Sequence, residues 1–434
     1  MHSFQITGGR RLSGTVRVGG SKNAALPMMA AAILADGPVR LEGLPRLTDV
    51  RTLARVLRQL GMRVARTRDD AVLLETVDPA PVRARYDLVR RMRASFCVLG
   101  PLLARRGHAV VSLPGGCNIG RRPVDLHLKG LAALGADLRL RHGYVIAEAP
   151  RLVGTAIDLT GPRGPTVTGT ANILSAAVLA QGKTTITGAA MEPEIVDLGN
   201  FLVAMGANIH GLGTPVLEID GVERLRGVAY RIIPDRIEAA TLLLAAAITG
   251  GSATIAGARP EHLTSVLETL RRAGLQIATG SEGITVTSSG RPGPIDITAL
   301  PYPGIPTDLQ AQLTALACVA DGRSTVRDCV FPHRFLHVAE LKRLGAKIEN
   351  CQGTAIVTGI EHLSGAEVTA SDLRASAALV IAGLAARGKT TIHQIHHLDR
   401  GYERLDEKLN RLGARVERLS PTAAPPHTMQ SRDR

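Results

Sequence analysis

The feature that most constrains the fold of this chain is a short phrase that recurs six times. It consists of two apolar residues three positions apart, a glycine directly after the second, and a further apolar residue three positions after the glycine. The six glycines lie roughly 70 residues apart, at Gly61, Gly135, Gly206, Gly274, Gly345 and Gly413. Each copy predicts the end of a helix, a glycine in the left-handed conformation that often follows helices, and then a strand.

A second phrase also recurs six times, out of phase with the first. It is an Ala-rich apolar segment that ends in glycine and leads into a β-branched strand. The copies are MMAAAILADGPVRLEG, CVLGPLLARRGHAVVSL, ILSAAVLAQGKTTITG, TLLLAAAITGGSATIAG, LTALACVADGRSTVRDC and LVIAGLAARGKTTIHQI. Helices that are apolar almost all round are buried in their domains, so these six should form the core. The amphipathic helices of the first phrase should form a more exposed layer.

Six units, each with two helices and short strands, predict an α/β protein built by repetition. The 434 residues are too many for one compact core, so we expect two domains of three units each. The best boundary falls between Gly211 and Pro234, in a stretch that lies between repeats. The C-terminal residues are polar and rich in proline, and we expect 419–434 to form a disordered tail.

The charge of the chain is strongly positive, with 52 lysines and arginines against 38 acidic residues. Such a balance is compatible with a nucleic-acid partner, and a basic nucleic-acid-binding protein is the distant alternative for the function. However, aromatic residues make up only 2% of the chain and tryptophan is absent, which leaves little to stack on bases. We therefore expect no nucleic acid among the partners.

The sequence also bears on location and on metals. No apolar run reaches the roughly 18 residues of a membrane-spanning helix, so we expect no membrane partner. Five cysteines without clustering fit a reducing cytosol, and we expect a cytoplasmic protein. The absence of CxxC and HExxH motifs gives a zinc site no local support, so no metal is expected.

Polar residues gather at one repeated place, the approach to each apolar helix. The six approaches are Ser21–Asn23, Met92–Ser95, Thr166–Thr170, Pro234–Glu238, Pro306–Asp308 and Ser371–Arg374. Several helix N-termini in one cleft would suit a polyanionic small molecule, because their backbone N–H groups are unpaired. For any single copy, helix capping is the simpler explanation. Lys22, Arg93 and Arg374 favour a functional role, since cations are disfavoured at that end of a helix.

The loop from Leu113 to Asp125 breaks the repeat, with three glycines and two prolines. Within it, Cys117 lies four and five residues before two arginines, and nearby cationic charge favours the thiolate. Cys117 is either a functional thiol or an ordinary loop cysteine, and spacing alone leaves both open. Asp308, in a turn stiffened by Pro306, is a candidate base. Cys97 and Cys318 lie in apolar helical segments and should be buried.

Taken together, these segments resemble the enolpyruvyl transferases, and the resemblance runs from about residue 4 to residue 418. The most specific segments are GSKNAALP at 20–27, MRAS at 92–95, PGGC at 114–117, RPVDLH at 122–127, EPEIVD at 192–197, PDRIE at 234–238, PTD at 306–308, DLRAS at 372–376 and DRGYER at 399–404. The resemblance implies two similar domains, each an inside-out α/β barrel of three βαββαβ-type units around buried parallel helices. It assigns 1–21 plus 234–434 to one domain, and 22–233, with the Cys117 loop, to the other.

The resemblance also implies the reaction. The enolpyruvyl group of phosphoenolpyruvate would pass to the 3-hydroxyl of UDP-N-acetylglucosamine through a tetrahedral ketal, with release of phosphate. In the family this is the first committed step of peptidoglycan synthesis, and it needs no cofactor and no metal. The alternative is transfer to another acceptor, shikimate 3-phosphate or a nucleotide. The cysteine loop and Arg122–Asp125 disfavour the shikimate enzyme.

The roles of individual residues are carried over from the family. Cys117 would be the general acid on a closing loop and the thiol that fosfomycin alkylates, while Asp308 would be the base and Asp372 would share proton handling. The expected catalytic residues are Cys117, Asp308, Lys22, Asp372 and Arg400. Phosphoenolpyruvate would be bound by Lys22, Asn23, Arg122, Arg374 and Arg400, whose guanidinium groups suit phosphate and carboxylate oxygens. The nucleotide sugar would be bound by Asn23, Arg93, Arg122, Pro123, Val124, Asp125, Leu126, Asp308 and Val330.

The chain departs from the family pattern at three places. Ala171 stands where an acidic residue is usual, and Gly161–Thr168 is rearranged relative to some members. Pro332 and His333 replace a Glu-Asn pair before Arg334. The rearrangement at Gly161–Thr168 leaves the uridine-side contacts there open, and we expect none of the three departures to touch the acid, the base or the phosphate-binding residues.

Overall fold

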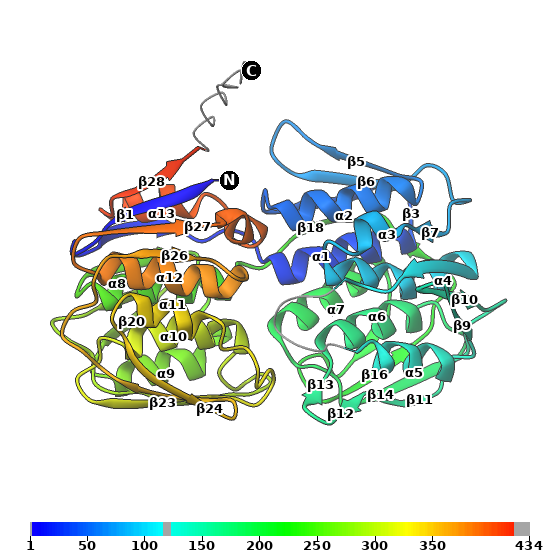
Figure 1. Ribbon diagram of the computed structural model, residues 1–434. Coiled ribbons are helices and arrows are strands. Elements are labelled where there is room, and N and C mark those ends of the chain that lie inside the picture. The colour runs from blue at the N-terminus through cyan, green and yellow to red at the C-terminus, as the bar shows by residue number, and fades with distance from the viewer. Residues whose placement is uncertain (1, 116–122, 421–434) are drawn as a thin grey trace, which may run out of the picture.

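The computed structural model describes residues 2–115 and 123–420. Cys117, Arg122 and residues 421–434 of the expected tail therefore lie outside the described residues. Figure 1 shows two lobes side by side. The first lobe has its apolar core in residues 24–233, and the second lobe has its core in residues 4–18 and 237–416. Within the described residues, no helix is long and apolar enough to cross a membrane.

The strands of the described residues form six four-stranded sheets with one shared pattern, three in each lobe. The first two strands of each sheet are parallel, and the other two neighbouring pairs are antiparallel. This arrangement, with helices between the strands, confirms the α/β class expected from the repeats.

The sheets of the first lobe are, in spatial order, β18 (Ala229–Arg231), β4 (Val39–Glu42), β6 (Val72–Thr76), β5 (Met62–Arg66); β7 (Arg83–Ala84), β8 (His108–Ser112), β10 (Tyr144–Glu148), β9 (Asp137–Arg141); and β11 (Ala156–Asp158), β14 (Lys183–Thr187), β16 (Val216–Asp220), β15 (Asn208–His210). Those of the second lobe are β2 (Ser13–Arg17), β19 (Ser252–Ala256), β21 (Gly283–Thr287), β20 (Gln276–Gly280); β22 (Asp296–Ala299), β23 (Arg323–Asp328), β25 (Thr354–Thr358), β24 (Lys347–Cys351); and β26 (Glu367–Thr369), β27 (Lys389–His393), β1 (Ser3–Thr7), β28 (Val416–Leu419). Two further pairs are β12 (Thr160–Gly161) with β13 (Gly164–Pro165) and β3 (Ala35–Asp36) with β17 (Leu225–Arg226).

Six helices from the Ala-rich segments are buried, as expected. They are α1 (Lys22–Ala31), α4 (Leu99–Arg106) and α6 (Val167–Ala177) in the first lobe, and α8 (Arg236–Ile248), α10 (Gln310–Ala317) and α12 (Leu373–Ala385) in the second. Every residue of α8 is buried. The coverage is less complete in α4, where Arg105 is exposed, and at the start of α6, where Val167 is exposed.

The amphipathic helices end as the sequence predicts. They are α2 (Thr48–Gln59), α5 (Asp125–Ala133), α7 (Pro193–Met205), α9 (Thr264–Arg272), α11 (His337–Arg343) and α13 (Leu405–Arg411). All six glycines that follow have positive φ, from 78° at Gly61 to 112° at Gly206. Only glycine adopts this conformation freely, which explains why it recurs at this position. Short helices complete the fold: α3 (Tyr86–Val89), η1 (Ala32–Leu34), η2 (Arg93–Val98), η3 (Pro260–His262), η4 (Thr307–Leu309) and η5 (Ile395–Arg400).

The chain passes between the lobes at two neighbouring points. Gly20 and Pro234 form an isolated β-bridge there, and the backbone N–H of Ser21 donates to the carbonyl of Ile233 at 2.7 Å. This pairing sets the first residues of α1 and α8 beside each other. The stretch from 211 to 234, where the sequence suggested a boundary, supplies β16, β17 and β18 to the first lobe.

Candidate functional site

The starts of α1, α8 and α12 come together at the boundary between the lobes. The backbone N–H of Lys22 donates to Asp235 Oδ2 at 3.1 Å, from the first lobe to the second. Asp235 Oδ1 accepts from the backbone N–H groups of Ile237 and Glu238, which caps α8. Asp235 also acts electrostatically on Arg374, the second residue of α12. Three of the polar approaches named from the sequence therefore meet at one place.

Helix capping accounts for part of those approaches. Side-chain oxygens of Ser21, Thr166, Asp235 and Asp372 accept backbone N–H groups at the starts of their helices. Asp372, expected to share proton handling, uses Oδ1 for the N–H groups of Arg374 and Ala375, at 2.9 and 3.1 Å. Its second oxygen lies 3.4 Å from the Ser371 hydroxyl. One carboxylate oxygen of Asp372 is thus committed to the helix.

Asp308 forms a centre with two arginines, which we call the Asp308 centre (Asp308, Arg334, Arg374). Arg334 Nη1 donates to Oδ1 at 2.8 Å and Arg374 Nη2 donates to Oδ2 at 2.7 Å. The arginine side chains are 8% and 4% exposed, whereas that of Asp308 is 27% exposed. Burial alone would raise the pKa of Asp308, but the charges and hydrogen bonds of Arg374 and Arg334 outweigh it and hold the pKa well below its ordinary value.

This electrostatic state defines what the Asp308 centre can do. A carboxylate held between two guanidinium groups stays ionised but is a weak base. A basic Asp308 requires the arginines to be drawn to another anion, and buried guanidinium forks bind carboxylates and phosphates well. An anionic substrate that entered beside Asp308 would therefore bind the arginines and increase the basicity of the carboxylate in one step.

A second centre spans the two lobes, and we call it the Asp49 centre (Lys22, Asp49, Arg400). Lys22 Nζ lies 2.8 Å from Asp49 Oδ2, and Arg400 Nε donates to Oδ1 at 3.0 Å. Lys22 and Asp49 belong to the first lobe, in α1 and α2, while Arg400 ends η5 in the second lobe. The Asp49 side chain is 4% exposed. The structure thus brings together Lys22 and Arg400, two of the residues expected to bind phosphoenolpyruvate.

Sequence reasoning missed two members of these centres, Asp49 and Arg334. Asp49 falls among the buried positions of α2 beside Val50 and Leu53, so an acidic residue on the apolar face was the available signal. Arg334 was noted only as the end of a departure from the family pattern. The Pro332-His333 departure forms a turn in which the N–H of Arg334 donates to the Phe331 carbonyl, and it leaves the arginine on Asp308.

The residues expected to hold the nucleotide sugar divide between the lobes. In the first lobe, Arg93 Nη2 donates to the carbonyl of Pro123 at 2.7 Å, and Asp125 and Leu126 open α5. In the second lobe, the N–H of Val330 donates to Asp328 Oδ1 at 2.9 Å. Val124 is half-buried beside Pro123, and Asn23 is half-buried as the second residue of α1.

The departures at Gly161–Thr168 and Ala171 belong to a strand pair and to α6. Residues 160–165 form the β12–β13 pair, and Ala171 is buried in α6 at 2% exposure. In the same helix, Asn172 Nδ2 lies 3.0 Å from His127 Nδ1, and the other nitrogen of His127 lies 3.2 Å from the Thr168 hydroxyl. These contacts tie α6 to α5, which carries Asp125 and Leu126.

The described cysteines Cys97, Cys318, Cys329 and Cys351 are free. Cys97 and Cys318 are buried, as expected, and burial raises the pKa of each thiol to about 12. Within residues 2–115 and 123–420, no group of three or more His, Cys, Asp or Glu side chains is placed to hold a metal ion. The absence of a metal from the reaction stays a prediction.

Comparisons with known proteins agree on one family. The family model described as EPSP synthase (3-phosphoshikimate 1-carboxyvinyltransferase) matches residues 6–409. A protein of Anaeromyxobacter sp. (strain Fw109-5) named UDP-N-acetylglucosamine 1-carboxyvinyltransferase is 52% identical over 96% of this chain and 99% of its own length. One of the same name from Akkermansia muciniphila is 50% identical over the same shares.

Solved structures extend the likeness. The enolpyruvyl transferase NikO from Streptomyces tendae superposes with a TM-score of 0.87 at 29% identity, covering 98% of this chain and 99% of its own. An EPSP synthase from Acinetobacter baumannii has a TM-score of 0.75 at 21% identity, covering 97% of this chain and all of its own, which shows a shared fold.

Proposed function

Because the chain belongs to the EPSP synthase family of enolpyruvyl transferases, we propose that it transfers the enolpyruvyl group of phosphoenolpyruvate to the 3-hydroxyl of UDP-N-acetylglucosamine. Relatives that are 50–52% identical in sequence over nearly the whole chain are named for this reaction. The structural observation that carries the proposal is the Asp308 centre, where two buried arginines hold one accessible carboxylate. A nucleic-acid-binding role and the shikimate acceptor are not favoured.

The proposed chemistry assigns each centre a part. Phosphoenolpyruvate would draw Arg334 and Arg374 from Asp308, with Lys22, Asn23 and Arg400 binding the rest of its charge. The freed Asp308 accepts the proton of the sugar 3-hydroxyl while that oxygen bonds to C2 of phosphoenolpyruvate, and an acid protonates C3. Loss of a proton from C3 and cleavage of the bond between C2 and the phosphate oxygen then release phosphate and leave the enolpyruvyl group on the sugar oxygen. Asp372 would share the proton handling through the oxygen that does not cap α12.

Cys117 and Arg122 lie outside the described residues, so their roles stay proposals that rest on the family resemblance. Cys117 would protonate C3, and Arg122 would bind substrate oxygens. Arg93 and Pro123 to Leu126 would contact the nucleotide from the first lobe, and Val330 from the second. Such a substrate would touch both lobes.

The finer architecture also belongs to this proposal. We propose that residues 1–21 plus 234–434 and residues 22–233 are two inside-out barrels, each with three units around buried parallel helices. The two separate apolar cores and the shared order of the six sheets support this division. A cytoplasmic location is proposed with it, because phosphoenolpyruvate is an intracellular metabolite.

The test is phosphate release by the purified full chain with phosphoenolpyruvate and UDP-N-acetylglucosamine, beside a reaction with shikimate 3-phosphate. We expect release with the nucleotide sugar only, and inhibition by fosfomycin. Cys117→Ala should lose most turnover near neutral pH, whereas Cys117→Asp should keep activity and resist fosfomycin. Phosphate release no faster than background with UDP-N-acetylglucosamine would contradict the proposed acceptor. An unchanged rate in Cys117→Ala would contradict the proposed role of Cys117 as the acid.

A further inference from the structure

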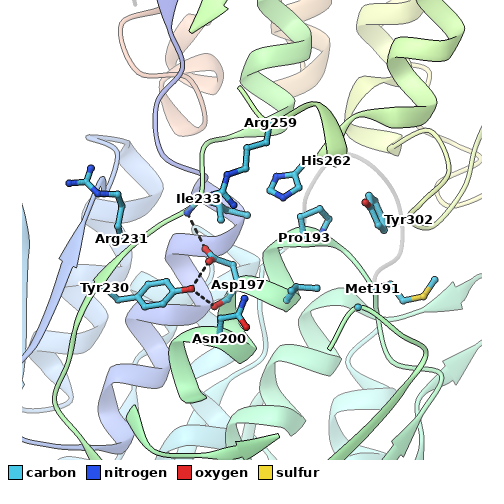
Figure 2. A pocket seen from close by; sticks show the side chains of 12 residues that line it. Met191, Pro193, Asp197, Asn200, Tyr230, Arg231, Ile233, Arg259, His262 and Tyr302 are labelled. Atoms are coloured by element: carbon cyan, nitrogen blue, oxygen red, sulfur yellow. Dashed lines mark hydrogen bonds between the residues drawn. The ribbon is translucent and has the colours of Figure 1, made fainter. Parts of the chain in front are cut away.

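A pocket of about 460 Å³ lies where the two lobes meet, apart from the residues assigned to either substrate. Its walls come from α7, from β18 and the residues that follow it toward the second lobe, and from the turns around η3 and Tyr302. Figure 2 shows Asp197 and Tyr230 on one side, with Arg259, His262 and Tyr302 across the pocket from them. None of its lining residues is used in the proposed reaction.

Most polar groups of the pocket already have partners. Asp197 accepts from the Tyr230 hydroxyl at 2.7 Å and from the backbone N–H of Ile233 at 3.1 Å. Arg231 donates to Glu42 at 2.7 Å, and the Tyr302 hydroxyl donates to the Glu261 carbonyl at 3.2 Å. These bonds fix the positions of Asp197 and Tyr302, whereas the guanidinium group of Arg231, with five N–H groups, keeps donors beyond the one on Glu42.

Two groups differ from the rest. Among the described residues, the side chain of the exposed residue Arg259 takes part in no hydrogen bond or ion pair, although it acts electrostatically on Asp197; only its backbone carbonyl accepts, from the N–H of His262. The Nδ1 atom of His262 is buried and likewise has no hydrogen-bond partner among the described residues. A guanidinium group and a ring nitrogen that both lack partners, and that line one pocket, suit the oxygens of an anion.

Apart from Asn200, the remaining lining is apolar or aromatic. Pro193, Val196 and Ile233 supply apolar surface, and the rings of Tyr230 and Tyr302 supply flat faces. Ligand pockets in proteins commonly combine such walls with a few polar groups that fix orientation. We propose that this pocket is a second small-molecule site, which binds a carboxylate or phosphate group carried on a compact apolar or aromatic body.

Such a ligand would touch both lobes at once. Arg259 and His262 belong to the second lobe, whereas Val196 and Tyr230 belong to the first. Occupancy of the pocket therefore links the lobes on a set of contacts separate from the Asp308 and Asp49 centres.

The test uses calorimetric titration of the full chain with benzoate and with phenyl phosphate, and with phenol as the uncharged control. We expect binding of at least one anion and not of phenol, with the stronger probe indicating whether carboxylate or phosphate is preferred. Arg259→Gln should weaken binding roughly tenfold or more. Arg271→Gln, which changes an exposed arginine in the neighbouring helix α9, should bind as the wild type does.

Asn200→Trp gives a second route, because Asn200 lines the pocket from an exposed position and a large ring there should block it. Melting temperatures equal to that of the wild type would show that both variants are folded. Equal affinity in Arg259→Gln and the wild type, or no binding of either anion, would overturn the proposal. The titration needs no turnover, so its outcome is independent of the phosphate-release assay.

Discussion

The Asp308 centre and the Asp49 centre have the same composition, one carboxylate between two cations, but differ in how the fold assembles them. All three members of the Asp308 centre come from the second lobe. The Asp49 centre takes two members from the first lobe and one from the second. The Asp308 centre therefore persists if the lobes separate, whereas the Asp49 centre exists only while they are in contact.

The two carboxylates also differ in access. The Asp308 side chain is 27% exposed and that of Asp49 is 4% exposed. Asp308 can meet a substrate directly, so it is a candidate catalytic residue. Asp49 acts through Lys22 and Arg400, which makes it a positioning residue. We propose that similar ion-pair chemistry serves the reaction at Asp308 and the alignment of the lobes at Asp49.

The largest effect should come from Asp308→Asn. The change keeps the shape but removes the proposed base and the charge between two buried arginines. We expect phosphate release to fall by about 10²- to 10⁴-fold. Asp321→Asn, which changes an exposed carboxylate paired with Arg291 in the same lobe, is the control and should be active. Similar rates in the two variants would refute the special role of Asp308.

Asp49→Asn should have the next largest effect. Misplacement of Lys22 and Arg400 should lower kcat/KM for phosphoenolpyruvate by about 10²-fold. Because the variant weakens a contact between lobes, small-angle scattering should show a larger radius of gyration, a change not expected in Asp308→Asn. Asp49→Glu keeps the charge and should restore part of the activity. An unchanged radius together with unchanged kinetics would contradict the alignment role.

Histidines next to each centre allow a comparison by pH. Burial lowers the pKa of His337, which interacts with Asp372 and Arg334, to about 4. Between pH 6.5 and 4 the unfolded chain binds a proton at this position that the folded chain does not, so stability falls as pH falls, by about 1.4 kcal/mol per unit. His337→Gln should remove this slope in urea unfolding.

His397, beside Arg400 and Asp372, is the counterpart at the Asp49 centre. Burial, His396 and Arg400 lower the pKa of His397, which is only half-buried. His397→Gln should therefore flatten the same pH dependence less than His337→Gln does. Equal slopes in the wild type and both variants would show that neither histidine is kept neutral by the fold.

The smallest effect should come from Tyr402→Phe. The ring lies 5.4 Å from the Arg374 guanidinium and would stay, while the hydroxyl loses contacts with Thr241 at 3.0 Å and Gln312 at 3.2 Å. Gln312 in turn donates to the Asp308 carbonyl at 2.9 Å. We expect the lost hydrogen bonds to raise the activation free energy by about 1 kcal/mol, which lowers kcat/KM roughly fivefold. Tyr86→Phe, at an exposed ring, should leave kcat/KM unchanged, and a similar loss there would argue against a specific effect.

The sequence predicted the structure best at positions where a single local cause determines the residue type. The six glycines after helices are recognisable because only glycine adopts the left-handed conformation freely, and all six have positive φ. The buried helices follow from their composition. Both kinds of prediction depend on local sequence, within about one helix length.

The site was less predictable because its properties depend on pairs far apart in the chain. Asp308 was expected as the base from its own turn, yet its electrostatic state is set by Arg334 and Arg374, and the second of these lies 66 residues away. Asp49 and Arg400 are 351 residues apart. No periodic pattern reveals such a pair, and the pocket at Arg259 likewise exists only once the lobes meet.

The position of β1 has a consequence for how the chain is made. This strand, from the first residues of the chain, lies between β27 and β28, which are among the last described residues. During synthesis its first partner, β27, is complete at residue 393, and its second partner, β28, only at residue 419. The first lobe can therefore complete its sheets once residue 231 has been translated, whereas the second lobe cannot complete the sheet that holds β1 until residue 419 has been translated.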